Sequence, residues 1–332
     1  MQNESFEFIE SNLSGDKASD LVFLFNQIIH LQKYNKADKI INIFLEYIHQ
    51  LLDEEGINTL SKIINENIQM KRDLYDIALF QIKKNEYYLA QLLLVILINS
   101  ENINEKTPSY SFSDLFQSLL YIYQYYQQNE NFFVLVEPVS SFYYHLGLIL
   151  FELKDYDKAI ELLDGALKYN PLLTDALYLQ SEAYYFKGEY ELAYQKTIKA
   201  LEYCYTKTAL ARGYFQLAKH FVFSQNIELS LALIMFVQHY NDTIICDDLL
   251  KEIDKMPHQD RILCQGQLKV LFNTHNIQIG PSAIVIKALN FFIQDAIEKN
   301  KINLALYFLN IGYQLTDDEY YFNQIKELSN KA

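Results

Sequence analysis

The chain has 332 residues and a formal net charge of −14, because 42 aspartate and glutamate side chains outnumber 28 lysines and arginines. A surface that follows the phosphates of a nucleic acid needs a positive stripe, so this balance argues against a nucleic-acid partner. Half of the residues are hydrophobic while only nine are glycine and five are proline, which favours long helices over a sheet protein and predicts an all-α fold.

The N-terminal region, residues 1–105, carries apolar side chains at helical spacing and is expected to form degenerate helix pairs near residues 24–44 and 71–99. Residues 1–20 are acidic and have no basic start before an apolar run, so we expect no secretory signal there. The longest apolar run, residues 92–98, is far shorter than the roughly 20 residues that cross a membrane. Three scattered cysteines without a C-x-x-C pair are typical of a reducing compartment. These features predict a soluble cytoplasmic protein without a membrane partner.

Residues 106–139 interrupt the helical pattern and are predicted to form an irregular joint. Pro108 lies in a polar stretch, and an aromatic helix containing residues 121–126 follows. Residues 132–136 form a short apolar, β-prone run that ends at Pro138. We expect this joint to separate the N-terminal region from a C-terminal superhelical half.

The next region, residues 140–242, repeats itself at a spacing of 34 residues. Small or aromatic residues recur in register, namely Gly147 with Ser181, Tyr156 with Tyr190, Ala159 with Ala193, and Ala166 with Ala200. A small side chain allows two helix axes to approach closely, whereas a bulky one holds them apart. A period of 34 with small residues at these offsets predicts a solenoid of antiparallel helix pairs.

Residues 140–173 resemble a tetratricopeptide repeat. Gly147, Ala159, Ala166 and the late Pro171 match the pattern of that family, while Tyr143 stands where its tryptophan is usual. The units at 174–207 and 208–242 depart further, because the first lacks the proline and the second needs three extra residues. The resemblance implies a right-handed α-solenoid, with residues 243–332 forming degenerate C-terminal repeats and a cap. From about residue 110 onward the chain is also similar to a bacterial tetratricopeptide family common in Firmicutes.

No motif for catalysis, a cofactor or a metal is found in the sequence. There is no phosphate-binding glycine loop, no G-x-S-x-G turn and no pair of histidines at helical metal-ligand spacing. We therefore expect a non-catalytic protein with no catalytic residue, no cofactor and no metal ligand.

The resemblance implies instead that the first helix of each unit lines a concave groove for a protein or peptide partner. Carried over position by position, the partner-binding residues are Tyr144, Leu148, Tyr178, Glu182, Tyr185, Arg212, Phe215 and Lys219. Tyrosine and phenylalanine offer large contact areas at low rotamer cost, and Arg212 and Lys219 are candidate anchors for a carboxylate. The alternative interpretation is that the rings pack against neighbouring helices and the charges are solvated.

Two functions remain open from the sequence. The first is a scaffold or adaptor that binds a protein or peptide in an aromatic groove. The second is a peptide-sensing regulator of the bacterial tetratricopeptide pheromone-receptor type. The region at residues 19–53 is apolar and acidic, so such a regulator would lack its own DNA-binding domain.

Overall fold

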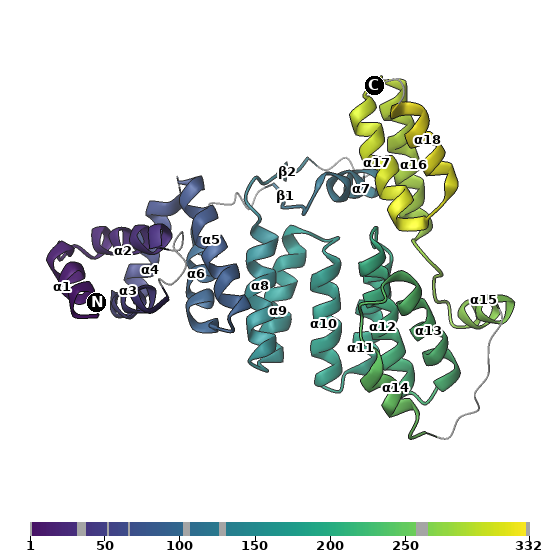
Figure 1. Cartoon of the computed structure of the whole chain (residues 1–332), viewed down its shortest axis with the longest axis horizontal. Coiled ribbons are helices and arrows are strands. Elements are labelled where there is room, and N and C mark those ends of the chain that lie inside the picture. Colours follow the sequence, from purple (N-terminus) through teal and green to yellow (C-terminus); the bar gives the residue numbers. More distant parts are fainter. Residues whose placement is uncertain are drawn as a thin grey trace. The chain divides into compact units, whose positions relative to one another are not determined.

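The computed structural model describes residues 2–31, 38–51, 53–65, 67–101, 107–125, 131–256 and 265–329. Helices dominate these residues, and consecutive helices pack as pairs, which confirms the predicted all-α, solenoid-like fold class (Figure 1). The chain forms two compact units that alternate along the sequence, one from residues 1–111 and 133–155, the other from residues 112–132 and 156–332. The four regions expected from the sequence remain a prediction.

The first unit contains seven helices among its described residues, with a short parallel pair of strands before the last of them. Its helices are α1 (Gln2–Asn12), α2 (Lys17–Leu31), α3 (Asp38–Leu51), α4 (Glu54–Asn65), α5 (Ile68–Lys83), α6 (Tyr87–Asn99) and α8 (Val139–Glu152). Helices α2 and α3 pack as one pair and α5 and α6 as another, and α8 packs on α6. Strands β1 (Ser109–Tyr110) and β2 (Phe133–Val134) are parallel, with Ser109 opposite Phe133.

The second unit begins with α7 and continues with the helices that follow residue 155. Its helices are α7 (Leu115–Tyr125), α9 (Tyr156–Tyr169), α10 (Thr174–Phe186), α11 (Tyr190–Leu201), α12 (Lys207–Phe223), α13 (Ile227–Tyr240), α14 (Asp247–Ile253), α15 (Gln265–Thr274), α16 (Ala283–Glu298), α17 (Ile302–Thr316) and α18 (Glu319–Ser329). The pairs α10–α11, α12–α13 and α16–α17 pack closely, and α10 and α12 lie side by side.

The small residues of the 34-residue period lie where helices meet. Ala159, Ala166 and Ala200 are fully buried. Ser181 replaces the family glycine, and its buried hydroxyl contacts the Ala193 carbonyl at 2.8 Å and the Thr197 hydroxyl at 2.7 Å. A serine is tolerated in this apolar contact because its hydroxyl finds hydrogen-bond partners inside it.

Helix α7 belongs to the second unit, although in the sequence it lies between the two segments that form the first unit. The buried Gln117 amide donates to the Leu172 carbonyl at 3.0 Å and accepts from Asn170 at 2.8 Å, on the turn between α9 and α10. Phe116 is also buried, with its ring 5.3 Å from Tyr205 and 6.2 Å from Phe308 of α17. Helix α7 therefore contacts both the central helix pairs and the C-terminal helices of its unit.

No helix in the described ranges combines the length and the apolar character needed to cross a membrane.

Candidate partner-binding surface

Helices α10 and α12 position six of the eight predicted binding residues, and a glycine allows the two helices to approach. A Cβ atom at Gly213 of α12 would lie 2.5 Å from the Leu201 side chain and 2.5 Å from the Tyr178 hydroxyl. Contacts this short do not occur between real side-chain atoms, so only glycine fits the observed spacing. The side chains of both helices are thereby brought onto one surface.

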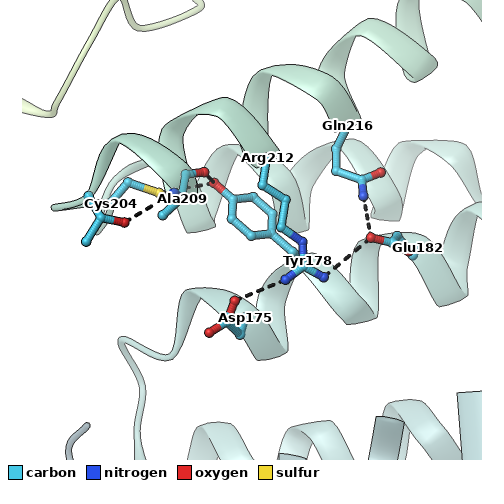
Figure 2. A network of polar contacts seen from close by, with 8 residues as sticks. Asp175, Tyr178, Glu182, Cys204, Ala209, Arg212 and Gln216 are labelled. Atoms are coloured by element: carbon cyan, nitrogen blue, oxygen red, sulfur yellow. Dashed lines mark hydrogen bonds and ion pairs between the residues drawn. The ribbon is translucent and has the colours of Figure 1, made fainter. Parts of the chain in front are cut away.

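Tyr178 lies in the core between these helices. Its side chain is fully buried, and its hydroxyl donates to the Ala209 carbonyl at 2.9 Å and lies 3.1 Å from the Cys204 sulfur (Figure 2). Burial raises the pKa of this phenol well above its usual value, so it stays neutral. The ring was expected in an accessible groove, but the structure places it where a partner cannot touch it, because the close approach at Gly213 covers it.

Arg212 is held by the protein's own acids. Its Nη1 lies 3.0 Å from Asp175 Oδ1 and its Nη2 lies 3.5 Å from Glu182 Oε1, so it links α12 to α10 (Figure 2). The Gln216 amide donates to the same Glu182 oxygen at 2.5 Å. The guanidinium also lies 5.4 Å from the centre of the Tyr178 ring. The charges of Arg212 and Glu182 are thus compensated within the chain, so neither residue is a strong candidate for binding a charged group of a partner.

Lys219 lies about two turns beyond Arg212 along α12 and has different surroundings. Its ammonium group lies 4.9 Å from the centre of the Tyr185 ring, 5.9 Å from that of Phe186 and 6.0 Å from that of Phe215. Within the described part of the chain it makes no hydrogen bond or ion pair. Burial lowers the pKa of Lys219, and this is partly opposed by the negative charges of Glu182 and Glu252.

The rings around Lys219 are partly accessible. Tyr185 and Phe215 are half-buried, while Phe186 is 55% exposed. Tyr185 also contacts Tyr190 of α11, with ring centres 5.3 Å apart. We call Lys219, Tyr185, Phe186 and Phe215 the lysine–ring cluster.

Tyr144 and Leu148 lie on α8 in the first unit and are half-buried. The Tyr144 ring lies 5.0 Å from that of its neighbour His145. Their part in partner binding remains a prediction for that unit alone.

Sequence reasoning missed Phe186, Gln216 and Glu252. Gln216 follows Arg212 by four residues, so helical spacing alone could have placed it beside the same acid. Phe186 adjoins Tyr185 at the end of α10, and its ring stacks on Tyr156 of α9 with centres 5.5 Å apart. Glu252 lies on α14, and no periodic signal connects that helix to Lys219.

The described residues contain no group of three or more histidine, cysteine or acidic side chains arranged to hold a metal ion.

Comparison with known proteins supports part of this interpretation. Residues 140–173 match the family model of the tetratricopeptide repeat, at the position that the 34-residue period predicts. A search of curated proteins finds no match. The chain therefore contains a tetratricopeptide repeat, a module that generally mediates contacts between proteins and is typically not catalytic. The similarity to a Firmicutes family remains an expectation.

Proposed function

We propose that the chain is a non-catalytic adaptor, and that its second unit binds a segment of a partner protein at the lysine–ring cluster. The observation that carries this proposal is Lys219, a partly buried cation with three rings around it and no hydrogen-bond acceptor among the described residues. A partly desolvated ammonium group without an acceptor has much to gain from one that a partner supplies.

The aromatic rings of the lysine–ring cluster also favour binding of a partner segment. Aromatic side chains at a contact surface contribute large buried areas and exclude water from a nearby polar contact. A partner segment that covers Tyr185 and Phe215 would place its oxygen atoms close to the Lys219 ammonium group. We infer that the segment combines an apolar side chain with an acceptor oxygen, either a carboxylate or a backbone carbonyl.

An affinity capture from the native cytosol tests this proposal. We expect the wild-type chain to retain one major protein and the double variant Tyr185→Ala/Phe215→Ala to lose it. The variant Val270→Ala is a control, because this side chain of α15 is 66% exposed and lies outside the cluster. Equal recovery by the double variant and the wild type would overturn the proposal. Recovery of only a short peptide, together with a higher melting temperature, would favour the peptide-sensing alternative.

A further inference from the structure

The first unit has a small open pocket that the lysine–ring cluster does not involve. Ile68, Arg72 and Tyr75 line it from one face of α5, at the helical spacing of four and three residues. Val136 and Glu137, which follow β2, and Phe142 of α8 complete the lining. Most of this lining is apolar.

The buried polar groups around the pocket already have partners. Lys71 forms an ion pair with Glu101 at 2.8 Å, and both side chains are almost completely buried. The Tyr75 hydroxyl lies 3.0 Å from His145 Nδ1, and its ring packs edge-on against Phe142 at 4.9 Å. These groups fix the walls, so the pocket offers mainly apolar surface to a ligand.

Arg72 adds an available positive charge at the mouth. Its side chain belongs to an exposed residue, and it makes no hydrogen bond or ion pair with any described residue. Guanidinium groups bind carboxylates with two parallel hydrogen bonds. The mouth is therefore complementary to a carboxylate held above an apolar group.

An open strand edge runs into the same pocket. The backbone N–H groups of Phe133 and Leu135 donate to the carbonyls of Pro108 and Tyr110, at 2.9 and 2.7 Å, on the β1 side. Because successive N–H groups of a strand alternate in direction, that of Val134 points away from β1, and Val136 follows two residues later in a bend. Their side chains are 56% and 75% exposed, and no described residue accepts a hydrogen bond from the Val136 N–H.

We propose that an extended acidic segment of a partner protein pairs with the open edge of β2. Pairing along residues 134–136 leads the segment to the pocket, where one apolar side chain packs on the exposed Ile68 and Val136 and a neighbouring carboxylate binds Arg72. Exposed edges commonly recruit peptides in this way, with the backbone giving affinity and the pocket giving selectivity. Glu137 lies at the far end of the edge and disfavours a second acid there.

A displayed library of random twelve-residue peptides tests this second site on the full chain. We expect the enriched sequences to share an apolar residue close to an aspartate or glutamate. One enriched peptide, synthesised with a fluorophore, is then titrated with each variant by fluorescence anisotropy. Arg72→Ala should weaken binding about tenfold, and Val136→Pro by at least about as much, because it removes the N–H of residue 136.

Two control variants separate loss of the proposed contacts from other effects of substitution. Val136→Ala keeps the N–H and should bind within about threefold of wild type, and Lys219→Met should bind the peptide unchanged because it lies in the other unit. Circular dichroism melts check that each variant is folded. Binding that survives either Arg72→Ala or Val136→Pro overturns the proposal, as does a library that yields no shared sequence. Self-association of the chain that Val136→Pro abolishes would also overturn it, because the occupant would then be a second copy.

Discussion

Lys219 is poorly placed to stabilise the fold. Its charge is partly removed from water, and cation–π attraction to the surrounding rings, about 0.5–2 kcal/mol, offsets only part of that cost. Because burial lowers its pKa, the folded chain binds this proton less tightly than the unfolded chain does. The charged form therefore costs stability, a cost that is fully present near neutral pH and disappears as the pH rises through the lowered pKa toward 10.5.

We expect Lys219→Met to be at least as stable as wild type at pH 7, with a gain of up to about 1 kcal/mol, and to lose partner recovery. The advantage over wild type should shrink as the pH is raised toward 10. Urea unfolding at several pH values measures both effects. Lys251→Met, at an exposed pair with Asp248, is the control and should leave the unfolding midpoint unchanged. A clear decrease in the unfolding free energy of Lys219→Met would show that the lysine stabilises the fold, contrary to this prediction.

Gly213 provides a second test at the residue scale. We expect Gly213→Ala to destabilise the chain by about 1–3 kcal/mol, because the added methyl group would overlap the Leu201 side chain and the Tyr178 hydroxyl. Thermal melts followed by circular dichroism measure the loss. An unchanged melting temperature would mean that α10 and α12 are not as close as described.

At the scale of elements, the helix pairs could be predicted from the sequence and their long-range partners could not. The repeat at residues 140–173 is visible because small residues recur 34 residues after Gly147, Ala159 and Ala166, and the structure buries all three. The aromatic helix expected at residues 121–126 belongs to α7, and the β-prone run contains β2. Periodicity shows which face of a helix is buried, but it does not show which helix covers that face.

For the candidate surface, too, positions on single helices could be predicted, but contacts between helices could not. The resemblance to the tetratricopeptide repeat predicted Tyr185, Phe215 and Lys219 as groove residues of two successive units. It could not show that Gly213 brings the helices close enough to bury Tyr178, nor that Asp175 and Glu182 bind Arg212. Both outcomes depend on distances between helices, which no pattern within one helix contains.

Helix α7 is the element whose role depends most on one polar side chain. We expect Gln117→Leu to cost about 2–3 kcal/mol, because it leaves the Leu172 carbonyl and the Asn170 amide without their partner in a buried place. Ser118→Ala, a change that removes only an exposed hydrogen bond to the Leu115 carbonyl of the same helix, should cost less than about 0.5 kcal/mol. Equal unfolding midpoints in urea for Gln117→Leu and Ser118→Ala would contradict the docking of α7 by hydrogen bonds.

At the scale of the whole molecule, the two units share the chain in an alternating order. The second unit takes α7 from a segment that precedes residue 133, so a single cut at residue 155 does not separate the units cleanly. We expect the fragment 156–332 to melt at a lower temperature than the second unit does in the full chain. A synthetic peptide of residues 112–125 should raise that temperature by binding where α7 lies. A fragment that ignores this peptide would contradict the assignment of α7 to the second unit.

The adaptor function rests on direct contact between a partner and the lysine–ring cluster. The most direct measurement replaces Phe215 by the photoreactive residue benzoylphenylalanine, illuminates cells that express the chain, and identifies the cross-linked protein by mass spectrometry. The same replacement at Met235, which is 50% exposed on α13, is the comparison. The account predicts one abundant cross-linked partner from position 215 and little from position 235. Equal capture at both positions, or none at position 215, would contradict it.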